Sequence, residues 1–519
     1  MTARILASTC ALALCAGAAS ADYSLTILHT NDFHARFEPI SAFDSGCSAE
    51  DNTAGECFGG SARLVTAVQE ARARSNNSIL VDGGDQFQGT LFYTYYKGAM
   101  AAEFMNLMGY DAMTVGNHEF DDGPEVLRGF VDSVSFPMLM SNADFAGEEM
   151  LADAIQKSVI IERGGERIGL IGLTPENTAE LASPGPNVTF SDPVAAVQAQ
   201  VDALTAQGVN KIIVLSHSGL NVDTRVAEGP TGVDVIVGGH DNSLLSNTIE
   251  GAKGPYPIMV GDTAIVQAYA YGKFLGELNV TFDDNGVITE AVGEPIIMDA
   301  SVTEDAASVA RVAELAAPLD EIRNEVVAEA VDMIVGDRAV CRQMECSGGN
   351  LIADAMLERV ADQGIQIGFM NSGGIRANID AGEVTKGEIL TVLPFQNTLS
   401  TFFVSGQAMI DALENGASQH EDGSGRFPQV AGMTFTVDLS MEPGSRISDI
   451  MVGGAAIDPA ATYGVVSNNF VRNGGDGYAM FRDAENAYDF GPDLADVVIE
   501  YMQAQGPYTP YTDGRITMK

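Results

Sequence analysis

Short apolar runs that alternate with helix-like stretches constrain the fold of this chain most strongly. Between about residues 23 and 282, six runs rich in β-branched residues have the character of buried strands: 25–28, 78–81, 112–115, 168–173, 211–215 and 233–237. Stretches that are apolar at helical intervals, such as residues 63–71, lie between several of these runs. Buried strands that are covered by helices on both faces make a layered α/β domain, which is the fold we expect for this part of the chain.

The pattern changes near residue 303. Apolar residues then recur every three or four positions and predict one amphipathic helix: Val309, Val312, Leu315, Leu319, Ile322 and Val326. The following sequence is rich in glycine, with helical stretches around 350–360 and 406–416 and strand-like ones at 433–437 and 463–467. Since 519 residues are too many for one ordinary core, we expect an α/β domain over 22–303, a linker helix over 304–326 and an α+β domain over 327–519.

The first 21 residues have the layout of a cleaved secretory signal. Arg4 precedes an apolar stretch over 5–19, and the small residues Ala19, Ser20 and Ala21 suit a cleavage site. A membrane anchor is the alternative, but the apolar run is short and no second run of about 20 apolar residues follows. Residues 513–519 also lack the apolar character of a glycolipid-anchor signal. We therefore expect a periplasmic or extracellular protein without a membrane anchor in the mature chain.

The number and the spacing of the cysteines are those expected of an exported protein. Cys10 and Cys15 lie in the expected signal, and the other four form two close pairs, Cys47 with Cys57 and Cys341 with Cys346. An even number of cysteines in an exported chain predicts two short-range disulfides. A zinc site built from all four thiolates is the alternative, but the intervals within and between the pairs do not resemble zinc-ribbon spacing.

The charge of the chain excludes some partners. There are 27 Lys and Arg residues against 71 Asp and Glu residues, which gives a formal net charge of −44. We therefore expect neither a nucleic-acid polymer nor an anionic membrane surface as a partner. A phosphorylated substrate would have to be attracted by local positive charge, from metal ions or from a few arginines.

Potential metal ligands follow five of the expected strands. The carboxyl ends of strands in an α/β sheet converge on one crevice, so that these side chains can meet there. Two divalent cations about 3.5 to 4 Å apart need about four protein groups each, including a bridging carboxylate. A single residue of this kind is more often a turn or capping residue, but a set of them predicts a metal site. The set is Asp32, His34, Asp85, Asn117, His217, His240 and Asn242.

The order of these motifs resembles a known family. Asp-x-His, Gly-Gly-Asp, Gly-Asn-His-Glu, a lone His and Gly-Gly-His resemble the metallophosphoesterase motifs, and residues 30–34 and 116–121 are similar to the 5′-nucleotidase branch. The resemblance implies an N-terminal layered α/β metallophosphoesterase domain, a linker helix and a C-terminal α+β nucleotide-binding domain. It also implies two divalent metal ions, such as zinc or manganese. One ion would be bound by Asp32, His34, Asp85 and Asn242, and the other by Asp85, Asn117, His217 and His240.

Asn242 and His118 differ from the other residues of this centre in what the resemblance implies for them. Family members often have Gln or His near position 242, so Asn242 departs from the family pattern. His118 directly follows a ligand and should face the substrate, where a pair with Asp121 would stabilise a positive imidazolium. Such a cation would stabilise the transferring phosphoryl group during in-line attack by a water that the two metals activate.

Three segments of the second domain suit a nucleoside: 369–376, 393–395 and 468–477. Taken singly, each phenylalanine in them would more often belong to the core. Together the segments resemble the C-terminal nucleotide-binding domain of the same family. The resemblance implies that two rings stack on the base, that Asn371 contacts the base edge, that Asp476 binds the ribose hydroxyls and that two arginines hold the ribose and phosphate side. The rings are Phe395 and Phe470, and the arginines are Arg376 and Arg342, the latter between the paired cysteines 341 and 346.

We therefore expect a secreted 5′-nucleotidase that hydrolyses AMP-like nucleoside monophosphates. Related activities of the same fold stay open: a 2′,3′-cyclic-nucleotide phosphodiesterase with 3′-nucleotidase activity, a UDP-sugar hydrolase and a nucleoside diphosphate hydrolase. A nucleotide-binding protein without catalysis is disfavoured, because both His118 and Asp121 are present.

Overall fold

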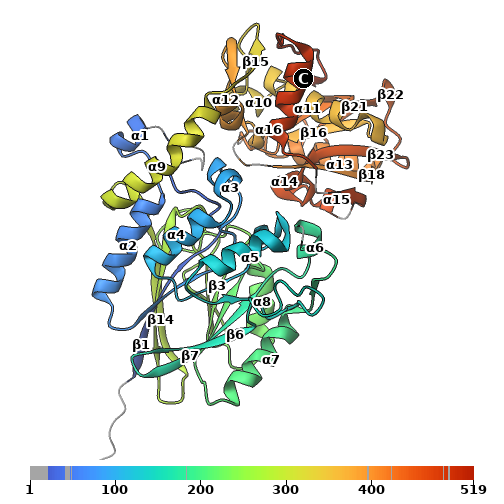
Figure 1. The fold of residues 1–519 in the computed structure, drawn as a ribbon. Helices are drawn as coiled ribbons and strands as arrows, with labels where there is room; N and C mark the ends of the chain where they lie inside the picture. The colour runs from blue at the N-terminus through green and yellow to red at the C-terminus, as the bar shows by residue number, and fades with distance from the viewer. Residues whose placement is uncertain are drawn as a thin grey trace, which may run out of the picture.

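The computed structural model describes residues 22–519 except 41, 43–46, 48, 183, 394, 396, 422, 483 and 489–490. The expected secretory signal over 1–21 lies outside the described residues. Two domains follow one another along the chain, and helix α9 (Ala306–Arg323) runs between them (Figure 1).

The N-terminal domain is built around two six-stranded sheets. The first has the strand order β14-β13-β1-β2-β3-β4. Its strands β1 to β4 are parallel, whereas β13 and β14 pair antiparallel at one edge. These strands are β1 (Tyr23–Thr30), β2 (Ser78–Asp82), β3 (Ala112–Thr114), β4 (Met138–Leu139), β13 (Phe274–Phe282) and β14 (Ile288–Ile297).

The second sheet has the order β11-β12-β10-β9-β7-β6. Its four central strands are parallel, and its two edge strands, β11 and β6, run antiparallel to their neighbours. The strands are β6 (Ser158–Arg163), β7 (Glu166–Leu173), β9 (Ile212–Ser216), β10 (Val235–Val237), β11 (Ile258–Val260) and β12 (Thr263–Val266). All six runs expected from the sequence to be strands are therefore strands.

The two sheets pack face to face, which differs from the expectation that helices cover both faces of the strands. Side chains of both sheets form one buried cluster that includes Ile27, Val81, Ile213 and Val235. Helices cover only the outer faces. A strand buried on both faces has the same continuous apolar sequence whether its neighbour is a helix or a second sheet, so the sequence could not separate these arrangements. The covering helices are α2 (Ser61–Arg74), α4 (Ala99–Met108) and α5 (Gly123–Ser133) on one side, and α7 (Pro193–Thr205) and α8 (Leu220–Glu228) on the other.

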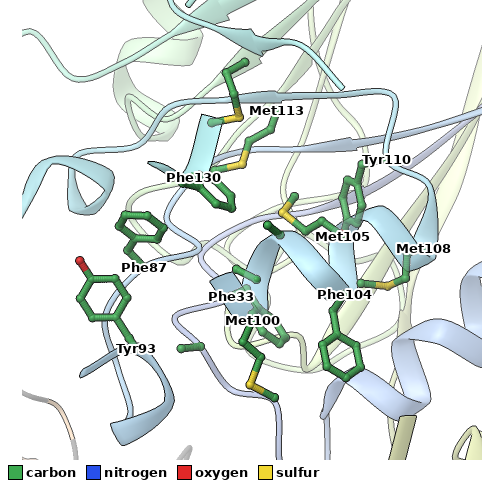
Figure 2. Close-up of a cluster of buried hydrophobic side chains, with 14 of the residues drawn as sticks. Phe33, Phe87, Tyr93, Met100, Phe104, Met105, Met108, Tyr110, Met113 and Phe130 are labelled. Atoms are coloured by element: carbon green, nitrogen blue, oxygen red, sulfur yellow. The ribbon is translucent and has the colours of Figure 1, made fainter. Parts of the chain in front are cut away.

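Aromatic rings and methionines fill the core beneath α4 and α5 (Figure 2). The Phe87 ring contacts Tyr93 and Phe130, with ring centroids 4.9 and 5.1 Å apart. Phe33 is buried in the same core and packs edge-on against Phe37 at 5.1 Å. Since Phe33 and Phe87 lie within two residues of Asp32 and Asp85, this packing anchors the loops that carry the expected metal ligands.

Helix α9 is shorter than the helix expected over 304–326. The Asp305 side chain caps its first turn by accepting a hydrogen bond from the Ser308 amide, and the helix ends at Arg323. Val326 instead begins strand β15 (Val326–Ala330), which pairs with β17 (Gly382–Thr385), so strand pairing overrides the helical period there. Val309 was also expected on the apolar face, but it is exposed. The helix buries Val312, Ala316 and Leu319 against the N-terminal core.

The C-terminal domain has mixed α and β structure. A five-stranded sheet of order β19-β16-β23-β18-β24 has α11 and α16 on one face and α13 on the other, and a four-stranded sheet of order β22-β21-β20-β25 adjoins it. The helices are α11 (Ser347–Arg359), α12 (Lys386–Val392), α13 (Gly406–Ala417) and α16 (Leu494–Gln505). The strands are β16 (Ile367–Asn371), β18 (Leu399–Ser405), β19 (Pro428–Ala431), β20 (Met433–Val437), β21 (Ile447–Val452), β22 (Ala455–Ala456), β23 (Thr462–Asn468), β24 (Glu485–Tyr488) and β25 (Ile516–Met518).

Short elements complete the domains. They are α1 (Ala49–Ala54), α3 (Leu91–Tyr96), β5 (Ala143–Asp144), α6 (Thr178–Leu181), β8 (Thr189–Phe190), α10 (Arg338–Cys341), α14 (Asn469–Arg472) and α15 (Ala479–Arg482). Among the described residues, no helix is both long and apolar enough to span a bilayer.

Both expected disulfides are present. Cys47 is bonded to Cys57, and Cys341 is bonded to Cys346. This pairing replaces the alternative of a zinc site built from all four thiolates.

Candidate metal centre and nucleoside site

The expected metal ligands all lie in loops that follow parallel strands of the two sheets. The loops after β1, β2 and β3 in the first sheet meet the loops after β9 and β10 in the second. The first sheet contributes Asp32, His34, Asp85 and Asn117, and the second contributes His217, His240 and Asn242. The centre therefore forms where the carboxyl ends of two packed sheets adjoin, rather than at the edge of one sheet.

Two groups of potential ligand atoms share Asp85. The atoms of Asp32, His34 and Asp85 lie within 4.8 Å of one another, as do those of Asp85, His217 and His240. His34 Nε2 lies 3.9 Å from Asp85 Oδ2, and His217 Nε2 lies 2.8 Å from the same oxygen. A carboxylate in this position is suited to bridge two cations.

The backbone at this centre is strained. Five of the expected ligands are non-glycine residues in the left-handed region, which side chains rarely adopt. Each such residue costs about 1 to 3 kcal/mol, and strain of this kind is concentrated at functional sites. The residues are Asp32 (φ 49°), His34 (φ 50°), Asp85 (φ 59°), His240 (φ 81°) and Asn242 (φ 51°).

The donor atoms are oriented as a divalent cation requires. His34 Nδ1 donates to the Phe87 carbonyl at 2.9 Å and His217 Nδ1 donates to the Gly83 carbonyl at 2.6 Å, so that Nε2 of each ring is the atom available for a metal. Asn117 Oδ1 and Asn242 Oδ1 are buried without a hydrogen-bond partner among the described residues. Imidazole nitrogens, carboxylates and such unpaired amide oxygens together fit first-row divalent ions.

Glu119 supports this centre, although its position in the sequence predicts no such role. Its buried carboxylate accepts four backbone N–H groups: Asp85 at 3.0 Å, Gln86 at 2.7 Å, Phe87 at 3.2 Å and Gly116 at 2.7 Å. Only the ionised side chain offers acceptors to all four donors. Glu119 thus joins the loop that carries Asp85 to the loop that carries Asn117. The sequence signal was its place in the Gly-Asn-His-Glu motif, but its partners become neighbours only in the folded domain.

His118 and Asp121 form the expected pair. His118 Nδ1 and Asp121 Oδ2 are 2.7 Å apart, and the His118 ring lies 5.3 Å from the His34 ring. Burial lowers the pKa of His118, but the carboxylates of Asp121 and Asp85 outweigh burial and raise the pKa to about 10. The Asp121 carboxylate therefore favours the imidazolium form of His118, in which Nε2 is the second donor.

In the C-terminal domain, Asn371 and Asp476 lie side by side. Asn371 Nδ2 donates to Asp476 Oδ2 at 2.7 Å, and Asn468 Nδ2 donates to Asn371 Oδ1 at 2.9 Å. Burial raises the pKa of Asp476, whereas Asn371 and three guanidinium groups lower it. These groups belong to Arg426, Arg342 and Arg376, of which Arg426 acts most strongly and was not singled out in the sequence.

The expected aromatic clamp residues are partly accessible. The Arg376 guanidinium lies over the Phe395 ring, 5.0 Å from its centroid. Phe470 is 44% exposed and its ring covers Gly475, where an added Cβ would lie 2.5 Å from ring atoms. Arg342 donates to the Gly423 carbonyl at 3.0 Å from within the loop that the Cys341–Cys346 disulfide closes. Stacking of the two rings on a base remains a prediction.

Known proteins resemble both halves of the chain. Residues 25–243 match the family of calcineurin-like phosphoesterases, and residues 326–483 match the C-terminal domain of 5′-nucleotidases. The chain is 37% identical over 545 residues to a 5′-nucleotidase of Diplobatis ommata, covering 99% of this chain and 92% of the relative. It is 38% identical over 528 residues to a snake venom 5′-nucleotidase of Naja atra, covering 95% and 98%. The solved 5′-nucleotidase precursor from Thermus thermophilus superposes with a TM-score of 0.71 at 39% identity, covering 96% and 99%.

The fold and the cluster of carboxylate, imidazole and amide groups define a metal-dependent phosphoester hydrolase. Its relatives match nearly the whole chain, including the second domain. The chain belongs to the 5′-nucleotidase family.

Proposed function

We propose that this protein hydrolyses nucleoside 5′-monophosphates such as AMP to the nucleoside and phosphate, outside the cytoplasm. The Asn371–Asp476 pair and its surrounding arginines carry the proposal, because they give the second domain groups that suit a ribose and an anionic phosphate. A general phosphatase would need only the first domain.

The metal ligands are assigned in two sets. Asp32, His34, Asp85 and Asn242 would bind one divalent ion, and Asp85, Asn117, His217 and His240 the other. When bound, such ions polarise phosphoryl oxygens and lower the pKa of water. Zinc and manganese both suit this donor set. Within the chain, the hydrogen bonds from His34 and His217 to backbone carbonyls fix the two rings in one tautomer.

His118 is assigned to the phosphoryl group. Its Nδ1–H is held by Asp121, which leaves the Nε2–H to donate to a phosphoryl oxygen. The positive ring would stabilise the charge that develops on these oxygens during in-line attack by water. No side chain of this chain is assigned as a covalent nucleophile.

The second domain is assigned to the nucleoside. Phe395 and Phe470 would stack on the base, and Asn371 would contact its edge. The Asp476 carboxylate would accept hydrogen bonds from the ribose hydroxyls, and Arg342 and Arg376 would hold the ribose and phosphate side. Stacking of a base on an aromatic ring contributes about 1 to 3 kcal/mol, which is enough to select nucleotides over small phosphate esters.

The two disulfides support a location in the periplasm or outside the cell, where such bonds persist. The substrate assignment is tested by phosphate release from AMP, 3′-AMP, 2′,3′-cyclic AMP, ADP and UDP-glucose at equal concentrations. We expect the largest kcat/KM for AMP. A larger value for any other compound in the panel would replace the assignment with that activity.

A further inference from the structure

Arg426 lies at the centre of a hydrogen-bond network behind Asp476. Its Nη1 donates to Asn415 Oδ1 and to Ser418 Oγ, both at 3.2 Å. Asn415 Nδ2 in turn donates to the Asp476 carbonyl at 3.1 Å. Arg426 therefore contacts the turn that carries Asp476 through one intervening side chain.

The position of Arg426 is itself fixed by several contacts. The Tyr478 hydroxyl donates to the Arg426 carbonyl, and the preceding Gly425 carbonyl accepts the Gly373 amide at 2.7 Å. Its guanidinium lies beside Ser418, the residue that caps the C-terminus of α13. A cation is favoured there by the partial negative charge of a helix C-terminus.

The turn needs such support because it is strained. Asp476 has φ 52° and ψ 23°, a left-handed conformation that costs a non-glycine residue free energy. The following Gly477 also has a positive φ, and a Cβ there would lie 2.8 Å from Asn415 Oδ1. Asn415 therefore packs directly against the turn and donates to its carbonyl, while the Asn371 amide donates to the Asp476 carboxylate.

We propose that Arg426 is a positioning residue for ribose recognition: through Asn415 it holds the Asp476 turn so that the carboxylate faces the ribose hydroxyls. The inference rests on the proposed nucleotidase function. Arg426 acts on the ribose site only through these neighbours and does not itself contact the substrate. Its positive charge also favours the ionised form of Asp476, which is the form that accepts two hydroxyl donors.

The test compares Arg426→Met and Arg426→Lys with the wild-type enzyme. The substrates are AMP, 2′,3′-dideoxy-AMP, which lacks both hydroxyls, and p-nitrophenyl phosphate, which lacks a nucleoside. We expect Arg426→Met to raise KM for AMP about tenfold with kcat within about twofold, and to lower the preference for AMP over the dideoxy compound by a similar factor. Arg426→Lys should recover part of the loss, because the lysine ammonium keeps the positive charge and can still donate hydrogen bonds. Turnover of p-nitrophenyl phosphate should not change.

A double-mutant cycle with Asp476→Asn separates a positioning role from direct binding. If Arg426 acts through Asp476, Arg426→Met should change KM for AMP less than twofold in the Asp476→Asn background. If the effects of Arg426→Met and Asp476→Asn on KM for AMP simply multiply, the inference is overturned. It is also overturned if Arg426→Met lowers the turnover of p-nitrophenyl phosphate as much as that of AMP. Arg359→Met, at an exposed arginine in the last turn of α11, is the matched control and should leave all three substrates unchanged.

Failure of the inference and failure of the proposed function give different results. A wild-type protein that does not hydrolyse AMP refutes both. Wild-type turnover of AMP, with an unchanged ribose preference in Arg426→Met, refutes the inference alone.

Discussion

Replacement of Glu119 by glutamine should weaken the N-terminal domain and its metal centre together. Glu119 Oε1 accepts the amides of Gln86 and Phe87, and Oε2 accepts those of Asp85 and Gly116. Glutamine keeps one oxygen but turns an NH₂ group toward two N–H donors. The loss of two hydrogen bonds to this buried carboxyl group, at about 1.5 kcal/mol each, corresponds to about 3 kcal/mol.

This free energy predicts a measurable shift in melting temperature. A domain of about 250 residues changes its Tm by about 2 °C per kcal/mol, so the metal-free Glu119→Gln variant should melt about 6 °C lower. The affinity for Mn²⁺, measured by isothermal titration calorimetry, should fall at least about tenfold, because the loop that carries Asp85 is less firmly held. Glu125→Gln, at an exposed glutamate in α5, is the control. A Tm within about 1 °C of this control, together with an unchanged Mn²⁺ affinity, would refute the role of Glu119.

Two further substitutions test the role of His118 in catalysis and the role of Phe470 in nucleoside binding. His118→Ala should keep its full metal content by elemental analysis but lose about 10²-fold or more in kcat, the scale of a lost transition-state partner. A loss of metal would instead make His118 a ligand. Phe470→Ala should lower kcat/KM for AMP about tenfold or more and leave glycerol 2-phosphate unchanged, because this ester has no planar ring that could stack on the Phe470 side chain. Tyr488→Ala, at an exposed aromatic residue of the same domain, should change neither substrate, and equal losses for both substrates in Phe470→Ala would end the base-stacking role.

The sequence predicted the strands and the ligand cluster because both depend on local signals. Continuous apolar runs predict buried strands, and the carboxyl ends of parallel strands bring Asp32, Asp85 and His217 to one place whichever sheet each strand belongs to. The second sheet was missed, since a buried strand has the same sequence beneath a helix or another sheet. Val326 was assigned to a helix by its spacing, but pairing with β17 places it in a strand.

Residues that act through long-range contacts could not be found in this way. Glu119 is 32 to 34 positions from three of its four backbone partners, and no local pattern relates them. Arg426 lies 50 residues from Asp476, in a short loop whose sequence has no distinctive periodicity. Both are recognised only from the hydrogen bonds that the folded domains create.

If two metal ions drive the reaction, AMP hydrolysis must depend on bound metal. Phosphate release from AMP should be measured on protein that elemental analysis shows to be metal-free, and again after addition of Mn²⁺ or Zn²⁺ with the bound ions counted. We predict negligible activity without metal, and activity that is restored as two ions bind per chain. Full AMP hydrolysis by the verified metal-free protein would show that the reaction does not need the two-metal centre.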